Sequence, residues 1–251
     1  QISSDGISAD PRKIAAIKDM RLPSTLKELR SFLGSCNWLR HLIPRFADIS
    51  SPLRPLLKKG CFRTSYSKEQ LKAFEDLKTW LTSAPLLSHP LWDHPFEVHC
   101  VASNTAIAGA LMQRDKEDKL RVVSYLSKAL TEAQKAYGVH ERELLALLYC
   151  LETWRSYFFG TTVTCWTDST AVAWLVKPSS NHSGRLLRWL IRLGEFNTDV
   201  RHKSGVTNHL PDFMSRCGAP SGSQTPSREP PPLAVLTRSQ SRSADNSQAQ
   251  P

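Results

Sequence analysis

Three acidic residues of this chain stand in apolar surroundings, where a carboxylate side chain is costly to place. Glu143 begins an apolar run that ends at Leu151, and it shares a helical stripe with large residues of that run. Asp168 directly follows a β-type segment, and Asp212 follows Pro211 near the start of the last predicted helix. A buried carboxylate is strongly unfavourable unless something pairs with it. Acidic groups that converge on a sheet edge in a basic protein favour magnesium held near a phosphodiester.

Each of these residues also has an ordinary structural interpretation. Asp168 is followed by Ser and Thr and is a possible helix N-cap. Glu143 is able to pair with the neighbouring Arg142 or with a distant base. Asp212 is the kind of residue that the helix dipole favours in a first turn. It is their placement together, on one long helix, one strand end and one last helix, that favours a metal site.

The elements that must position these residues follow from the periodicity of the sequence. The first 85 residues are predicted to be helical, with helix starts at Asp10-Pro11, Thr25 and Ser67. The pattern then predicts strands at 96–102, 106–113, 120–126, 162–167 and 197–203, and helices at about 140–157, 183–195 and 209–216. This order indicates an α/β fold of the α+β type: one mixed sheet with a three-strand meander, then alternating helices and strands.

Charge and composition restrict the class of protein further. Among 251 residues, 33 Lys and Arg exceed 23 Asp and Glu, which gives a net charge of +10. Such an excess favours a polyanion partner, nucleic acid first. Apolar residues make up 40% of the chain, enough for a core. No apolar run reaches the roughly 18–20 residues that a membrane span needs, so no membrane partner is expected.

The cysteines and the C-terminal segment indicate the environment and the domain limits. The six cysteines are scattered without a C-x-x-C pair, which argues against a disulfide framework or a zinc site. With no visible signal peptide, we expect an intracellular protein, cytoplasmic or nuclear, and not a secreted one. From residue 218 the chain is rich in Pro, Ser and Gln, as in a linker. We therefore predict domains at 1–85 and 86–217 and a disordered linker at 218–251.

The motifs around these residues match a known family in order and spacing. The stretch from about residue 4 to 216 resembles the pol polyprotein of gypsy-like long-terminal-repeat retrotransposons. It covers the thumb- and connection-like end of the reverse transcriptase and the ribonuclease H domain behind it. The motifs are Leu29-Arg-Ser-Phe-Leu-Gly34, Ile43-Pro-Arg-Phe46, Glu143-Leu-Leu-Ala146, Thr167-Asp168, Gly184-Arg-Leu-x-Arg-Trp189 and Asp212-x-x-Ser-Arg216.

The resemblance implies a metal-dependent nuclease site. In the family, four carboxylates hold two Mg²⁺ (or Mn²⁺) ions, and Glu143, Asp168 and Asp212 match three of them. His202 and Asn208 resemble in spacing the loop His and Asn of retroviral ribonucleases H, where the His assists proton transfer or product release. The implied activity is hydrolysis of the RNA strand of RNA–DNA hybrids during reverse transcription. No Asp-Asp dipeptide occurs, so no polymerase active site is expected in this chain.

The fourth carboxylate position departs from the family. The segment Phe96-Glu-Val-His-Cys-Val-Ala-Ser103 fits the first strand of the domain, but Val101 stands where the metal-bridging Asp is due. Valine offers no lone pair, so we expect an incomplete two-metal site. We also expect residues 143, 168 and 212 to gather at one rim of the sheet, with residue 101 on the same side.

Two groups of basic residues are candidates for nucleic-acid contact. Arg185, Arg188 and Arg192 form a stripe on one predicted helix, which suits a phosphate backbone, although an ordinary solvated face has the same pattern. A second cluster lies in the thumb-like segment and comprises Arg40, Arg45, Arg54, Lys58, Lys59 and Arg63. Such contacts read backbone shape and 2′-hydroxyls, so the expected ligand is an RNA–DNA hybrid or another duplex.

Three hypotheses follow. The first is a retroelement ribonuclease H, impaired by Val101. The second is a catalytically decayed nucleic-acid-binding or structural module, and the third is an inert relic. The resemblance further implies that the chain is a fragment of a polyprotein, with reverse transcriptase palm and fingers upstream and integrase downstream.

Overall fold

The computed structural model describes residues 2–3, 6–83, 86–170, 172 and 184–203. The chain divides into two compact units, Gln1–Ala219 and Pro220–Pro251, and the second lies wholly outside the described residues. The predicted last helix, the linker, Asn208 and Asp212 also fall outside them. No helix in the described ranges combines the length and apolar character that a membrane crossing requires.

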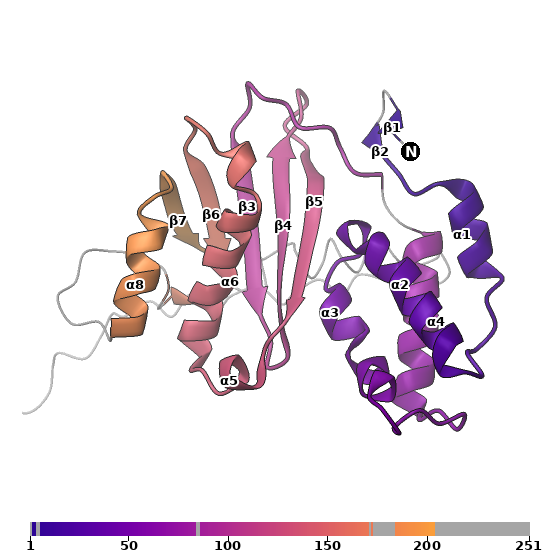
Figure 1. Ribbon diagram of the computed structural model, residues 1–251. Helices are drawn as coiled ribbons and strands as arrows, with labels where there is room; N and C mark the ends of the chain where they lie inside the picture. Colours follow the sequence, from indigo (N-terminus) through magenta and orange to yellow (C-terminus); the bar gives the residue numbers. More distant parts are fainter. Residues whose placement is uncertain (1, 4–5, 84–85, 171, 173–183, 204–251) are drawn as a thin grey trace, which may run out of the picture. The chain divides into compact units, whose positions relative to one another are not determined.

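A five-stranded mixed sheet forms the centre of the first unit (Figure 1). Its strands lie in the order β5-β4-β3-β6-β7, with β3, β4 and β5 antiparallel and both β6 and β7 parallel to β3. This arrangement confirms the predicted fold class. The strands are β3 (Phe96–Ala102), β4 (Ala106–Arg114), β5 (Leu120–Ala129), β6 (Val163–Thr167) and β7 (Thr198–His202).

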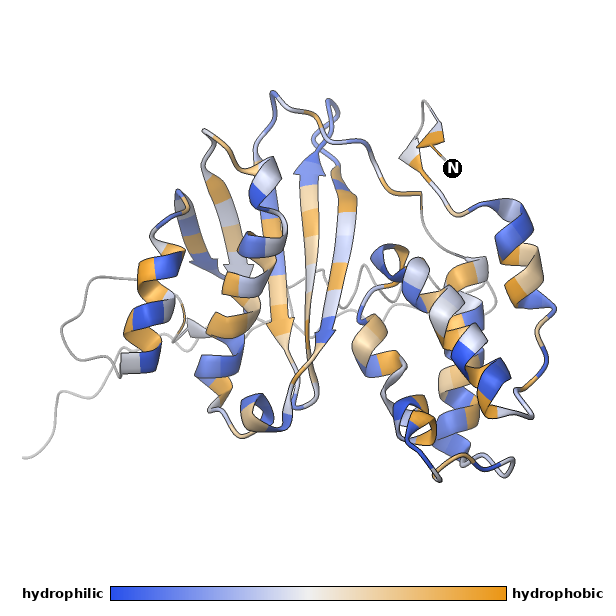
Figure 2. Cartoon of the chain, in the orientation of Figure 1, coloured by the Kyte–Doolittle hydropathy of each residue, from blue (hydrophilic) through white to orange (hydrophobic). Residues whose placement is uncertain are grey.

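Helix α6 (Val139–Thr153) packs on one face of this sheet because its apolar residues and those of β3 and β6 form one buried cluster. Helix α8 (Gly184–Leu193) packs beside α6. The hydropathy colouring in Figure 2 follows this burial along β4, where eight of nine residues are buried. The contact between α6 and β4 is close: a Cβ atom added at Gly109 would lie 2.4 Å from the Sγ atom of Cys150.

The helical segment before the sheet has a second core, which it shares with the other face of the sheet. This cluster joins apolar residues of the helices to Ala110 and Met112 of β4 and to Val122 of β5. Gln1–Ala219 forms a single compact unit. The division into two domains at residue 85 stays a prediction. The elements of the segment are β1 (Ile2–Ser3), β2 (Gly6–Ile7), α1 (Pro11–Lys18), α2 (Leu26–Trp38), α3 (Phe46–Ile49) and α4 (Lys68–Thr82), with 3₁₀ helices at Arg40–Leu42 and Ser51–Leu57.

Local sequence signals account for the helix starts. Asp10 caps α1 by accepting a hydrogen bond from the Arg12 N–H, and Ser67 with Gln70 forms a complete capping box on α4. Thr25 accepts a hydrogen bond from the Glu28 N–H, as expected of a residue that starts a helix. The Glu28 carboxylate accepts from the backbone N–H of Ser24, the residue before Thr25. The long helix ends at Thr153, earlier than predicted, and a 3₁₀ turn at Arg155–Tyr157 follows it. The short helix α5 (Glu132–Lys135) was not predicted.

We predict opposite effects for two glycine-to-alanine substitutions. Gly109→Ala places a methyl group against Cys150 and should lower the free energy of unfolding by about 1–3 kcal/mol, the usual cost of overpacking. Gly34→Ala in α2 meets open space and should raise it by about 0.5–1 kcal/mol through helix propensity. Urea unfolding followed by circular dichroism measures both. Equal effects would contradict the close packing of α6 on β4.

Candidate active site and nucleic-acid groove

Three parallel strands end together at one edge of the sheet. Strands β3, β6 and β7 run in the same direction and end at Ala102, Thr167 and His202. Thr167 pairs with His202, and the Lys203 N–H donates to the Thr167 carbonyl oxygen over 2.9 Å. The carboxyl ends of parallel strands are where α/β sheets usually hold ligands. Asp168, directly after β6, therefore lies at this edge.

Glu143 on α6 reaches the same edge from one face of the sheet. Its side chain is buried, with a residue exposure of 4%. The Oε1 atom accepts a hydrogen bond of 3.0 Å from the backbone N–H of Ala102, at the end of β3. The Oε2 atom is buried and has no hydrogen-bond partner among the described residues. One oxygen of this carboxylate thus holds the helix to the strand end, and the other is left for a ligand.

The charges at this edge change the titration of Glu143. Burial, followed by the negative charge of Asp168, raises the pKa of Glu143 to about 8, although the Ala102 hydrogen bond opposes the shift. Asp168 itself is exposed. An exposed carboxylate next to a buried one that has an unpartnered oxygen gives a donor set that suits a divalent cation. In the described ranges, no group of three or more His, Cys, Asp and Glu residues could hold a metal ion.

His140 is a site residue that the sequence analysis missed. Its Nδ1 atom lies 3.3 Å from the Ser169 hydroxyl oxygen, so the first turn of α6 contacts the loop after β6. The signal for it was its position one helical turn before Glu143, on the same side of the helix. His202, which was predicted, is exposed and ends β7 at the same edge.

The predicted side for residue 101 is wrong. Alternation along β3 directs Cys100 toward α6 and Val101 toward the opposite face, where its side chain packs against the core shared with the helical segment. The pairing of His99 with Trp166 places Val101 level with Asp168 when the register is continued by two residues. Residue 101 therefore lies close to the end of β3, but its side chain is on the face opposite the one from which Glu143 reaches that end.

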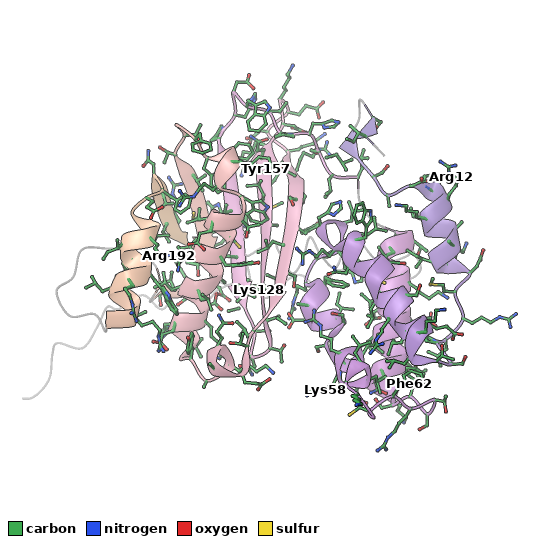
Figure 3. All side chains as sticks on the ribbon, in the orientation of Figure 1. Arg12, Lys58, Phe62, Lys128, Tyr157 and Arg192 are labelled. Atoms are coloured by element: carbon green, nitrogen blue, oxygen red, sulfur yellow. The ribbon has the colours of Figure 1, made fainter. Side chains whose placement is uncertain are left out.

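The predicted arginine stripe on α8 is mostly engaged with the protein itself. Arg185 bonds to Glu141, and its guanidinium carbon lies 4.1 Å from the ring centre of Tyr137. Arg192, labelled in Figure 3, bonds to Glu152. The reason is that α6 directs acidic residues toward α8. Of the three arginines, only Arg188 is both exposed and without an ion pair among the described residues.

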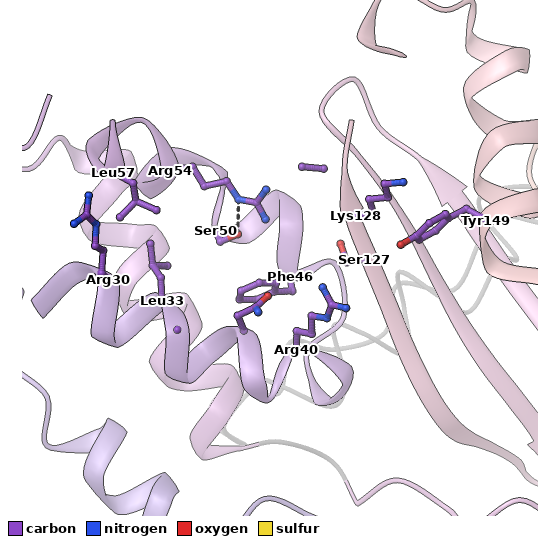
Figure 4. Close-up of a pocket in the computed structure, with 13 residues that line it drawn as sticks. Arg30, Leu33, Arg40, Phe46, Ser50, Arg54, Leu57, Ser127, Lys128 and Tyr149 are labelled. Atoms are coloured by element: carbon purple, nitrogen blue, oxygen red, sulfur yellow. Dashed lines mark hydrogen bonds between the residues drawn. The ribbon is translucent and has the colours of Figure 1, made fainter. Parts of the chain in front are cut away.

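A basic groove lies between the helical segment and the sheet (Figure 4). Its volume is about 620 Å³, and it lies between α2, α3 and the second 3₁₀ helix on one side and the end of β5 with Tyr149 on the other. The residues described along it include no acidic side chain, and the Lys128 Nζ atom lies 4.1 Å above the Tyr149 ring. Its basic lining residues are Arg30, Arg40, Arg54 and Lys128.

The groove explains part of the predicted basic cluster. Arg40 and Arg54 line it, and the Arg54 Nε atom donates to the Ser50 hydroxyl over 3.3 Å. Arg45 instead pairs with Asp48. Lys58, Lys59 and Arg63 are exposed outside the groove lining. Sequence reasoning missed Arg30 and Lys128, because they come from distant parts of the chain.

Comparison with known proteins agrees with this fold. Residues 66–165 match the family of RNase H-like domains found in reverse transcriptases. The chain is 32% identical over 227 residues to the retrovirus-related Pol polyprotein from transposon opus of Drosophila melanogaster, covering 86% of this chain and 22% of the relative. It is 33% identical over 218 residues to the transposon Tf2-3 polyprotein of Schizosaccharomyces pombe, covering 86% of this chain and 16% of the relative.

Solved structures give the same fold. A foamy viral protease-reverse transcriptase in complex with double-stranded DNA matches with a TM-score of 0.66 at 21% identity, covering 80% of this chain and 36% of that one. The foamy viral enzyme in complex with an RNA/DNA hybrid matches with a TM-score of 0.64 at 21% identity, covering 93% of this chain and 31% of that one.

The sheet and its carboxylate edge thus define an RNase H-like domain of the reverse transcriptase type. The chain belongs to the Pol polyproteins of retrotransposons, the family that its motifs resemble, and it spans about a fifth of the length of the relatives described above.

The raised pKa of Glu143 predicts how stability depends on pH. A carboxyl group whose folded pKa exceeds its unfolded value binds its proton more tightly in the folded state. Without metal, stability should therefore fall as pH rises from about 4.5 to about 8, by on the order of a few kcal/mol, and then level off. Glu143→Gln should flatten this decline, and Glu75→Gln, at an exposed position, should not. Urea unfolding in EDTA between pH 5 and 9 tests this.

Proposed function

We propose that this chain hydrolyses the RNA strand of RNA–DNA hybrids with the aid of Mg²⁺ or Mn²⁺, as the ribonuclease H part of a reverse-transcribing polyprotein. The observation that carries the proposal is the unpartnered, buried Oε2 atom of Glu143 beside Asp168 at the parallel strand ends. Asp212 is proposed as a third ligand by its motif. Bound divalent ions would supply positive charge to the scissile phosphate and to the water that attacks it.

The side chains of this edge have separate proposed roles. Glu143 must lose its proton to hold a cation, and its hydrogen bond to Ala102 fixes the direction of the carboxylate. Asp168 contributes the second negative charge. His202, exposed at the end of β7, is placed to move a proton to or from the leaving group. Ser169 and His140 hold the loop that carries Asp168 against α6.

The basic groove is the proposed track for the nucleic-acid backbone. Its four cationic side chains come from both the helical segment and the sheet, which suits a duplex that contacts both. A foamy viral relative in fold was solved with an RNA/DNA hybrid, and we extend that ligand class to this chain. Asn208 and Arg188 are further proposed contacts. In the polyprotein, the palm and fingers would precede this chain and the integrase would follow it.

A second candidate function rests on Val101. In this alternative the chain lacks efficient catalysis and still binds hybrid or duplex nucleic acid as a structural module, because the groove lining does not include residue 101. Strong cleavage by the unmodified chain would exclude this alternative.

We predict that Val101→Asp restores cleavage. The resemblance places the metal-bridging carboxylate at this position, so activity on a labelled RNA–DNA hybrid in Mg²⁺ should rise by orders of magnitude, provided that the new side chain turns out of the core shared with the helical segment toward the strand end. The double variant with Glu143→Gln is the control and should show only background cleavage. A flat response to Val101→Asp, with folding unchanged by circular dichroism, would mean that the damage lies elsewhere and would favour the binding module.

The groove gives a prediction for binding alone. Arg54→Ala and Lys128→Ala should each weaken binding to a hybrid, and each should lower the slope of log K against log salt concentration by about 1. Lys18→Ala, an exposed lysine on α1 outside the groove, should leave both quantities unchanged. Fluorescence anisotropy over a salt series measures the slopes. Equal slopes for all three variants would contradict the groove as the track.

A further inference from the structure

We infer that Asp48 is a positioning residue, which locks the helical segment to the loop after β3 and so sets the spacing between the basic groove and the carboxylate edge. The inference deepens the proposed function and rests on it. Asp48 lies in α3, far along the chain from every residue of the edge, and the sequence analysis gave it no role.

The contacts of Asp48 cross from the helical segment to the sheet. Its Oδ1 atom accepts hydrogen bonds from the hydroxyls of Ser103 over 2.8 Å and Thr105 over 2.7 Å. Its Oδ2 atom accepts from the Arg45 Nε atom over 3.2 Å. The side chain is 17% exposed, so water competes little for these bonds. Hydrogen bonds to a charged group are stronger than bonds between neutral groups.

The backbone conformation at the start of α3 directs Asp48 toward the sheet. Arg45 adopts a left-handed conformation with φ of 52°, and the helix begins directly after it. This turn brings Asp48 to the β3–β4 loop, and it also directs the Ala47 N–H to the Ser127 hydroxyl of β5, over 3.0 Å. One short helix is thereby attached to two places on the sheet. A left-handed non-glycine residue carries a strain that the surrounding contacts must offset.

The loop that Asp48 holds is continuous with the carboxylate edge. The Ser103 hydroxyl accepts from the backbone N–H groups of Thr105 and Ala106, over 3.1 Å and 2.9 Å, and so organises the whole turn. Ser103 directly follows Ala102, whose N–H holds the Glu143 carboxylate. A change in the position of Asp48 therefore reaches the Glu143 side chain through two hydrogen bonds, from Ser103 to Asp48 and from Ala102 to Glu143, joined by the covalent link between Ser103 and Ala102.

The same attachment also fixes the groove. Ser127 and Lys128 belong to the sheet side of the groove, whereas Phe46 and Ser50, which flank Asp48 in the chain, belong to the helical side. The Ala47–Ser127 and Asp48–Ser103 contacts thus hold the two walls together. A duplex seated in the groove would then meet the carboxylate edge at one fixed distance along its length.

The test maps where a bound hybrid lies relative to the edge, without relying on hydrolysis. Fe²⁺ replaces Mg²⁺, and ascorbate with peroxide generates hydroxyl radicals that cut the strand near the bound ion. The wild-type chain should cut an end-labelled hybrid in one narrow cluster at a fixed distance from its end. Asp48→Ala should shift or spread this cluster by at least one nucleotide, which is about 3.4 Å of duplex. Affinity in the same buffer should change by less than the loss seen for Arg54→Ala.

Three further variants control the test. Asp48→Asn retains an oxygen that accepts from both hydroxyls, so its cutting cluster should stay where the wild-type cluster lies, even if Asp48→Ala fails to fold. Glu75→Ala removes an exposed carboxylate from the same helical segment and should also leave the cluster in place. The Thr105→Val variant loses one of the two hydroxyls and should broaden the cluster.

The outcomes separate this inference from the proposed function. If the wild-type chain gives no localised cutting, no metal is held near the hybrid, and both the proposed function and this inference fall. If the wild-type cluster is present and is unchanged in folded Asp48→Ala or in Thr105→Val, the positioning role of Asp48 falls and the proposed function stands.

Discussion

The contact between the Glu143 carboxylate and the Ala102 N–H governs the arrangement of the site. It places a charged group inside the protein, where desolvation is severe, and directs it to the end of the central strand. The hydrogen bond satisfies one oxygen only, and the second oxygen has no protein partner in the described ranges. A fold that keeps this unfavourable pair in place does so through the packing of α6 along β3 and β4, because the helix cannot withdraw its glutamate without opening the apolar cluster below it.

The topology supplies the edge on which this contact acts. The antiparallel meander alone would leave its strand ends alternating, so no two neighbouring carboxyl ends would meet. The crossovers through α6 and α8 add β6 and β7 parallel to β3, and three carboxyl ends then coincide. With α6 and α8 on one face, the helical segment covers β4 and β5 on the other face. The groove forms where that segment meets the end of β5.

The predicted elements succeeded where the signals were local. Capping residues fixed the starts of α1 and α4, and the strand limits of β3 came from alternation within seven residues. The side of Val101 and the partners of Arg185 and Arg192 depend on which helix packs against which face, and this is a tertiary property. The prediction for the first 85 residues named no helix start between Thr25 and Ser67, and the prolines at 44, 52 and 55 leave no clear local signal for α3 or for the 3₁₀ helix after it. Asp48 had no local signal for its attachment to the sheet, because Ser103 and Thr105 lie more than fifty residues away.

The valine at position 101 affects the charge repulsion at the end of β3. Burial, and after it the charge of Asp168, already raises the pKa of Glu143 to about 8. A third carboxylate at position 101, level with Asp168, would increase the repulsion that must be offset in the metal-free protein. Valine removes that charge, and its side chain adds to the core shared with the helical segment. Under the proposed function, valine in place of a carboxylate would therefore favour folding in the absence of metal and would weaken metal binding. The groove, whose lining does not include residue 101, is unaffected by the exchange.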